Sequence, residues 1–373
     1  MSEVIRSIKR SEREAFQRFL ERCFGSGRGS WQRWQPELFL DAADADEFHL
    51  VAEVDGEFVS HVGGYPLPVR VGPARVMTAG VGNVGTHPNA RGKGYMTKLL
   101  DESIRQWRDR KWTLSALWGD RQRYGAFGWE SCGIKYTARL SERSLSRSGI
   151  EAADVDEVDP LDPAVVTRVA ELHATIPCRV ERPEFAMKLR RDGLRLFLGR
   201  DGYLLSSGDY GDLRVSEVAS PTGLAPELIA GAMDRARAGS ADVEFGPGDI
   251  GRLSRVVDAM SGWQCGTQGM LRILDWPGLV RDLQPWLQER AEGMASFKQS
   301  IGCRWHDETE WVTVGWDGTE LSVADTQATG GVEVDLPRLT GLVFGSPLAG
   351  AESLGAFAQL LPVPVHIPGL DHV

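Results

Sequence analysis

The stretch that decides the fold is residues 81–96, which read VGNVGTHPNARGKGYM. Pro88 interrupts a glycine-dotted extended segment, and two glycines flank Lys93 where a helical pattern begins. The apolar positions of that pattern share one helical face; they are Met96, Leu99, Leu100, Ile104 and Trp107. Glycines allow backbone N–H groups to approach a ligand closely, and a helix N-terminus favours anions. The stretch therefore predicts a strand, a pyrophosphate-binding turn and an amphipathic helix.

Three phosphate-binding turns compete for this pattern. A P-loop requires Ser or Thr after the lysine, but Gly94 follows Lys93, which excludes it. A dinucleotide-binding turn requires a third glycine at the position of Thr97, so that interpretation is weak. The pattern that remains is a strand, then P-x-x-R-G-x-G, then a helix. An ordinary strand-to-helix turn with an exposed arginine and lysine is the alternative without a ligand.

This pattern resembles motif A of the GNAT superfamily of acyl-CoA-dependent N-acyltransferases. The resemblance implies that acetyl-CoA is the cosubstrate and that no metal is used. It also implies that the loop amides hold the pyrophosphate, while the preceding strand pairs with the pantetheine arm. The cofactor-binding positions that it identifies are Val84, Thr86, Arg91, Gly92, Gly94 and Tyr95.

A second segment narrows the resemblance. Residues 123–129 read RYGAFGW and are similar to the Y-G-R-F-G-Y run of the Eis-like (enhanced intracellular survival) branch, with Ala126 in place of its arginine. Met96, where most GNAT loops have a small residue, points to the same branch. The resemblance implies that Tyr124 is the general acid and that the C-terminal carboxylate of Val373 is the base. Alternatively, Tyr124 is a buried tyrosine that only packs and forms hydrogen bonds.

The base has several alternatives. A C-terminal carboxyl group has an ordinary pKa of about 3.5, which makes it a poor base unless burial raises that pKa. Terminal residues usually fray, although three prolines, Pro362, Pro364 and Pro368, stiffen the approach to this one. Weaker candidates for the base are His61, Glu53 and Asp120, and a structural role explains His61 better. The resemblance places Phe24, Trp31 and Trp34 in the region that lines the acceptor cleft of the family; alternatively, they only pack a helix.

The order of elements predicts a mixed α/β (α+β) chain in three domains. Residues 1–145 form the predicted GNAT acetyl-CoA-binding domain. Residues 150–272 are expected to be a degenerate GNAT-like domain that lacks P-x-x-R-G-x-G and does not hold CoA. Residues 273–373 resemble the sterol-carrier-like C-terminal domain of the Eis-like family. The acidic stretch 151–163 is predicted to be a linker, and residues 351–361 to be a helix.

Composition restricts the class of protein. A net charge of −10 argues against a general nucleic-acid surface and mildly favours cationic substrates. No apolar run is long enough to span a membrane, and the N-terminus lacks the apolar core of a secretory signal. The five cysteines are scattered without metal-ligand spacing. We therefore expect a cytoplasmic chain with free thiols and no bound metal.

The leading hypothesis is an acetyl-CoA-dependent N-acetyltransferase that acts directly on a primary amine. The acceptor could resemble a polyamine or an aminoglycoside, or be a lysine side chain. Relatives of this architecture form homo-oligomers, including hexamers. Two other hypotheses stay open at this point: a CoA-binding scaffold without chemistry, and lipid carriage by the C-terminal domain.

Overall fold

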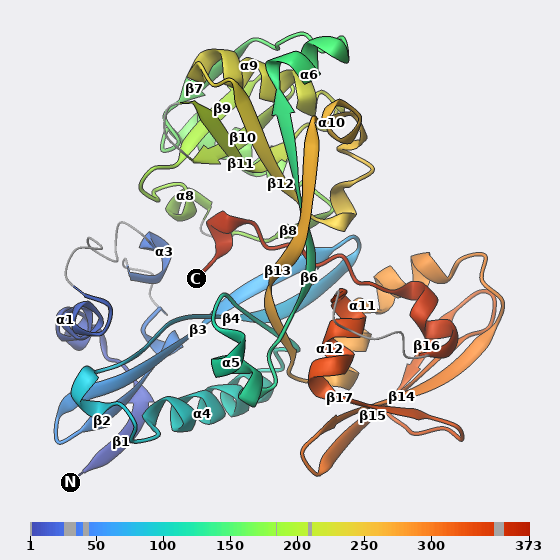
Figure 1. The fold of residues 1–373 in the computed structure, drawn as a ribbon. Helices are drawn as coiled ribbons and strands as arrows, with labels where there is room; N and C mark the ends of the chain where they lie inside the picture. Colours follow the sequence, from blue (N-terminus) through green and yellow to red (C-terminus); the bar gives the residue numbers. More distant parts are fainter. Residues whose placement is uncertain (1, 26–34, 40–44, 184, 208–210, 347–353) are drawn as a thin grey trace.

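The chain has a mixed α/β fold, as predicted from the order of its elements. Figure 1 shows it arranged in three packed bodies. The computed structural model describes residues 2–25, 35–39, 45–183, 185–207, 211–346 and 354–373. Two bodies are built on mixed sheets, and the third carries a separate four-stranded sheet. Among the described residues, no helix is long and apolar enough to cross a membrane.

The N-terminal body is a sheet with a helix on each face. Its strands are β1 (Glu3–Ser7), β2 (His49–Val54), β3 (Glu57–Val71), β4 (Ala74–Thr86) and β5 (Leu114–Leu117), in that spatial order. They pair antiparallel, except that β4 and β5 are parallel. The predicted amphipathic helix is α4 (Tyr95–Asp109), which buries Leu99, Leu100 and Trp107 on one face of the sheet. On the other face, α1 (Arg13–Phe24) buries Phe16, Phe19 and Leu20.

The second body repeats the plan. Its strands are β7 (Val155–Val158), β8 (Cys178–Val180), β9 (Arg195–Gly199), β10 (Gly202–Ser207), β11 (Asp212–Ala219) and β12 (Ser240–Phe245). Its helices are α6 (Glu142–Arg147), α7 (Pro163–His173), α8 (Phe185–Lys188), α9 (Ala225–Ala236) and α10 (Ser254–Ala259). As in the N-terminal body, one parallel pair, β11 with β12, lies among antiparallel neighbours, whereas β8 pairs with β3.

The predicted linker was wrong in part. Residues 155–158 form β7, which pairs antiparallel with β9 at the end of the sheet. Val155 is buried there, while Asp156 and Glu157 are exposed. Charged side chains suit an edge strand, because one side of its backbone is unpaired and charge there discourages pairing with another chain. The acidic composition that suggested a linker at residues 155–158 therefore belongs to an edge strand.

Two long strands join the first two bodies. They are β6 (Glu130–Ser141) and β13 (Gly262–Ile273), which pair antiparallel with each other. At one end β13 also pairs with β5, and at the other β6 pairs with β12. The sheets are consequently continuous through backbone hydrogen bonds, and both strands cross the junction in Figure 1.

The C-terminal body packs its own sheet against two helices. Its elements are α11 (Trp276–Ala291), β14 (Phe297–Trp305), β15 (Glu308–Trp316), β16 (Leu321–Ala324), β17 (Val332–Asp335) and α12 (Leu336–Phe344). The strand order is β16-β15-β14-β17. The predicted helix at 351–361 is a 3₁₀ helix, η6 (Gly355–Leu360), and residues 351–353 lie outside the described residues. Pro362 follows closely and a short segment docks through Phe357 and Leu360, so an α-helix does not extend here.

Candidate active site

A β-bulge in β4 separates the end of this strand from β5. Parallel pairing of β4 with β5 ends at Val81, opposite Leu117. Directly beyond, the register of β4 against β3 shifts, so that Asn83 and Val84 face the single residue Val62. Asn83 has a φ of 55°, and its carbonyl oxygen lies 2.7 Å from His61 Nδ1. Such a bulge bends its strand and re-aims the residues that follow. The end of β4 therefore diverges from β5.

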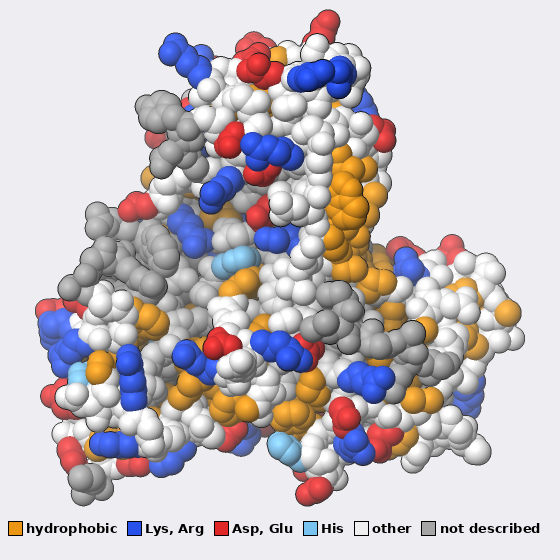
Figure 2. Space-filling model, viewed as in Figure 1, with side chains coloured by type: hydrophobic (Ala, Val, Ile, Leu, Met, Phe, Trp, Pro, Cys, Tyr) orange, Lys and Arg blue, Asp and Glu red, His pale blue; other side chains and the backbone are white. Residues whose placement is uncertain are grey.

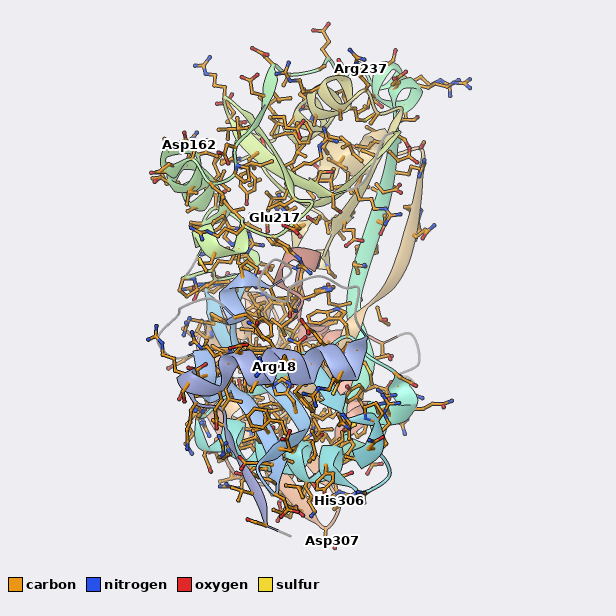
Figure 3. All side chains as sticks on the ribbon, turned by 90° about the vertical axis from the view of Figure 1, so that its left-hand side faces the viewer. Arg18, Asp162, Glu217, Arg237, His306 and Asp307 are labelled. Carbon is orange, nitrogen blue, oxygen red and sulfur yellow. The ribbon has the colours of Figure 1, made fainter. Side chains whose placement is uncertain are left out.

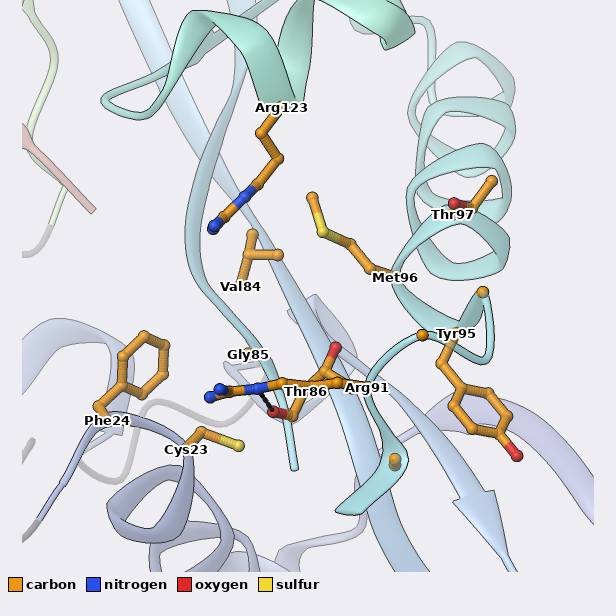
Figure 4. Close-up of a pocket in the computed structure, with 13 residues that line it drawn as sticks. Cys23, Phe24, Val84, Gly85, Thr86, Arg91, Tyr95, Met96, Thr97 and Arg123 are labelled. Carbon is orange, nitrogen blue, oxygen red and sulfur yellow. Dashed lines mark hydrogen bonds between the residues drawn. The ribbon is translucent and has the colours of Figure 1, made fainter. Parts of the chain in front are cut away.

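A cavity of about 550 Å³ lies between the end of β4 and the start of α4 (Figure 4). The structure brings all six predicted cofactor-binding residues into its lining: Val84, Thr86, Arg91, Gly92, Gly94 and Tyr95. Their role in binding CoA stays a prediction. The remaining lining residues are Cys23, Phe24, Gly85, Ala90, Met96, Thr97 and Arg123.

The turn before α4 and the first residues of that helix line this cavity. Gly92 and Gly94 have φ values of 75° and 78°, and a Cβ atom on either would meet no described atom within 4 Å. Gly94 is the N-cap of α4, and no side chain of the described part of the chain caps it. The first turn carries no acidic residue. Unsatisfied N–H groups and the helix dipole together attract an anion, so this turn fits a pyrophosphate.

This geometry predicts opposite effects on stability and on ligand binding for Thr97→Asp. A carboxylate in the first turn of α4 should leave the melting temperature unchanged or higher, since it interacts favourably with the helix N-terminus. The same charge should repel a bound pyrophosphate and weaken CoA binding about tenfold, which corresponds to ~1.4 kcal/mol. Thermal melts and calorimetric titration with CoA measure the two effects. Thr97→Asn, of equal size and without charge, is the control, and equal CoA affinity in both variants would contradict the prediction.

Tyr124 lies beside this cavity without lining it. It ends the short helix α5 (Arg121–Tyr124), and its ring packs edge-on against Trp129 with centroids 6.2 Å apart. Tyr124 is 7% exposed, and its ring lies over Gly119, where a Cβ atom would come within 2.5 Å of it. Burial raises the pKa of the Tyr124 hydroxyl, and the neighbouring Arg123 offsets part of that shift. The phenol therefore stays protonated at neutral pH, as a general acid must.

Arg123 is a charged cavity residue that sequence reasoning missed. It belongs to the RYGAFGW segment, but no role was predicted for it. Figure 4 shows its side chain reaching into the cavity near Val84 and Met96. Its position directly before Tyr124 was the available signal. Of the aromatic residues predicted near the acceptor, Phe24 lines the cavity, whereas Trp31 and Trp34 lie outside the described residues.

The C-terminus lies on β4, close to the bulge. A Cβ atom at Gly82 would stand 2.3 Å from the carboxyl carbon of Val373, and one at Gly80 would stand 2.8 Å from its Cγ2. The tail is packed and not frayed, since Ile367, Leu370 and Asp371 are buried. The two glycines therefore provide the space that the last residue fills.

The weaker candidates for the base all have structural partners. His61 is fully buried, its Nε2 lies 3.2 Å from His49 Nδ1, and burial lowers its pKa well below the usual value. Glu53 accepts a hydrogen bond from Arg6 on the neighbouring strand. Asp120 caps α5 by accepting from the backbone N–H of Gln122. These contacts favour structural roles. Within the described ranges, no cluster of His, Cys, Asp and Glu could hold a metal ion.

Comparison with known proteins defines the class of the N-terminal body. Residues 4–132 match the family model described as an acetyltransferase (GNAT) domain. This part of the chain is therefore a GNAT acetyltransferase domain. No match was found among curated proteins.

Solved structures extend the similarity to the whole fold. A GCN5-related N-acetyltransferase from Kribbella flavida superposes with a TM-score of 0.74 at 19% identity, covering 100% of this chain and 98% of that one. One from Anabaena variabilis has a TM-score of 0.69 at 15% identity, with 98% and 97% covered. Eis1 from Mycobacterium abscessus has a TM-score of 0.65 at 18% identity, with 92% and 90% covered. At these identities the similarity establishes the fold alone.

Proposed function

We propose that this protein is an acetyl-CoA-dependent N-acetyltransferase that transfers the acetyl group directly to a primary amine. One observation carries the proposal. Within a GNAT domain, the cavity between the diverging end of β4 and the uncapped start of α4 gathers all six motif residues. An anion-binding turn beside an open strand end is the arrangement that an elongated CoA molecule requires.

The chain's own residues account for each proton. The amine nitrogen forms a bond to the thioester carbonyl carbon, and a backbone N–H near Val84 stabilises the oxygen that becomes negative. The Val373 carboxylate accepts the proton that the attacking nitrogen loses. The carbon–sulfur bond then breaks, and Tyr124 donates its phenolic proton to the departing sulfur. Solvent returns a proton to Tyr124 and takes one from Val373, which leaves an amide and free CoA.

The resemblance to the Eis-like branch supports a finer assignment. We infer three domains at 1–145, 150–272 and 273–373, of which the second is a degenerate GNAT-like domain and the third is sterol-carrier-like. A lipid-carrying role for the third has little support, because large side chains fill its interior; they include Trp276, Leu339, Phe344 and Phe357. We therefore infer that this domain serves the assembly of the active site.

The acceptor is inferred only as a class. A small polyamine, an aminoglycoside-like amine or a lysine side chain agrees with the net charge of −10. Acidic and basic side chains are interspersed over the face shown in Figure 2. Cytoplasmic location and homo-oligomerisation, including a hexamer, stay predictions from the sequence, and light scattering tests the second.

Release of free CoA thiol tests the proposal. Purified protein with acetyl-CoA should release thiol in the presence of at least one member of a panel of polyamines, aminoglycosides and lysine peptides. Mass spectrometry should then find the acetyl group on the amine nitrogen. Binding of CoA without turnover on any amine would instead favour a CoA-binding scaffold.

A further inference from the structure

In the second body, the C-terminal tail lies beside a bulge that corresponds to the bulge of the first. Parallel pairing of β11 with β12 ends at Val215, and a register shift against β10 follows immediately at Ser216. β4 has the same arrangement: its parallel pairing with β5 ends, and its register against β3 shifts directly beyond. Here His366 and Pro368 of the tail line a gap of about 10 Å³ beside Ser216, and Gly369 and Leu370 border a cavity of about 710 Å³ on the Val215 side.

Hydrogen bonds hold the tail at this place beside the bulge of β11. Gln268 of β13 donates a hydrogen bond to the carbonyl oxygen of Ile367, and its side-chain oxygen lies 2.9 Å from His366 Nδ1. A Cβ atom at Gly246 would stand 2.7 Å from the His366 side chain. The tail is thus fitted to the second body by close packing as well as by hydrogen bonds.

A buried arginine connects the tail to the second body. Arg182 donates to Asp371 through Nε at 2.9 Å and through Nη2 at 2.7 Å. Its Nη1 and Nη2 also donate to Glu217 of β11 at 3.0 and 2.7 Å. The side chains of Arg182 and Asp371 are fully buried. In Figure 3, Glu217 lies in the lower part of the second body, toward its junction with the N-terminal body.

Two further side chains contact the Glu217 carboxylate and hold it in place. Tyr203 donates its hydroxyl proton to Glu217, and His173 Nδ1 lies 3.4 Å from the same carboxylate. The nearby Arg182 charge keeps the pKa of Glu217 well below its usual value, against the effect of burial. A buried charge network of this kind is a poor source of stability compared with apolar packing. Its geometric specificity is therefore the better explanation for its presence.

The ion pair of Arg182 with Asp371, which we call the clamp, lies only two residues from the end of the chain. Two residues span at most about 7 Å, so fixing Asp371 restricts the Val373 carboxylate to a small volume beside β4. Between them, the ring of His372 stacks on Trp118 of the N-terminal body with centroids 3.6 Å apart. The last three residues are thus held successively by the second body, by Trp118 and by the β4 glycines.

We propose that Arg182 and Asp371 are positioning residues that hold the Val373 carboxylate at the transfer site. In this role the second body holds the tail beside the bulge of β11. The inference rests on the proposed function, because Val373 is there the acceptor of the amine proton. Arg182 and Asp371 themselves touch no substrate.

The test is Asp371→Asn in the full-length protein. We expect kcat to fall about 10- to 100-fold, because small displacements of a reacting group have effects of this size. KM for acetyl-CoA should stay within about twofold, since the cavity at α4 is untouched. Asp371→Glu, which keeps the charge, should recover part of kcat. Glu227→Gln, which removes the partner of Arg255 elsewhere in the second body, should have the kcat of the native protein.

Carboxypeptidase digestion provides a readout independent of catalysis. The native tail should resist release of Val373, whereas Asp371→Asn should release it faster at a temperature where both proteins are folded. If kcat and resistance in Asp371→Asn equal those of the native protein, the inference is overturned. Loss of kcat only in proportion to folded protein, without recovery by Asp371→Glu, also overturns it. If the native protein acetylates no amine, the proposed function fails, and digestion alone decides whether the clamp exists.

Discussion

Replacement of Tyr124 by phenylalanine is expected to lower kcat for acetyl transfer about 10²- to 10⁴-fold, the usual range for loss of a general acid. The ring packs on Trp129 and over Gly119, and phenylalanine keeps these contacts. CoA should bind as before, because the predicted pyrophosphate-binding turn at α4 is unchanged. Steady-state kinetics with acetyl-CoA and the best amine measure the effect, and thermal stabilisation by CoA confirms that binding is retained.

The pH dependence adds a second signature of Tyr124. Burial raises the pKa of its hydroxyl above the ordinary value of 10.0. A general acid is active while protonated, so any alkaline loss of kcat that belongs to Tyr124 should have its midpoint above pH 10. Tyr136→Phe, on β6 and away from the cavity, removes a hydroxyl without affecting the site and is the matched control. A Tyr124→Phe enzyme within about threefold of native kcat would rule out this role.

Gly82→Ala should have the second-largest effect, a loss of about 100-fold in kcat. The added methyl group would stand 2.3 Å from the carboxyl carbon of Val373, so the C-terminus must move off β4. Gly82 does not have a positive φ, and alanine therefore introduces no backbone strain there. Kinetics and carboxypeptidase digestion report the loss of the base and the displaced tail in the same samples.

A matched glycine separates this effect from a general effect of alanine in a strand. Gly262 begins β13, and a Cβ atom there meets no described atom within 4 Å. Gly262→Ala should therefore keep native kcat and native resistance to digestion. Native kcat in Gly82→Ala, together with a displaced tail, would show that Val373 is not the base.

The local sequence was sufficient to predict which residues gather around the cavity at α4. Pro88, Gly92 and Gly94 determine a turn whose geometry depends on neighbouring residues only, and the helix after it has a clear apolar face. The six residues chosen from that pattern line one cavity. A turn of this kind can be predicted from a single sequence, because its geometry needs no residue that is distant in the chain.

The other end of the site depends on long-range contacts, which a single sequence does not reveal. The position of Val373 depends on the packing of the tail beside β11 and on the ion pair of Asp371 with Arg182. Neither contact is visible in the sequence around Val373. β7 was missed because an edge strand can have the composition of a linker. Only the resemblance to the Eis-like branch suggested that the C-terminus takes part.

The central claim is direct acetyl transfer from the cavity at α4 to an amine. The most direct measurement is mass spectrometry of an amine panel incubated with acetyl-CoA that carries a deuterated acetyl group. The account predicts the label on an amine nitrogen with native protein, and its near-complete loss with Tyr124→Phe and with Gly82→Ala. Unlabelled amines throughout the panel, from native protein that CoA stabilises against heat, would contradict the account.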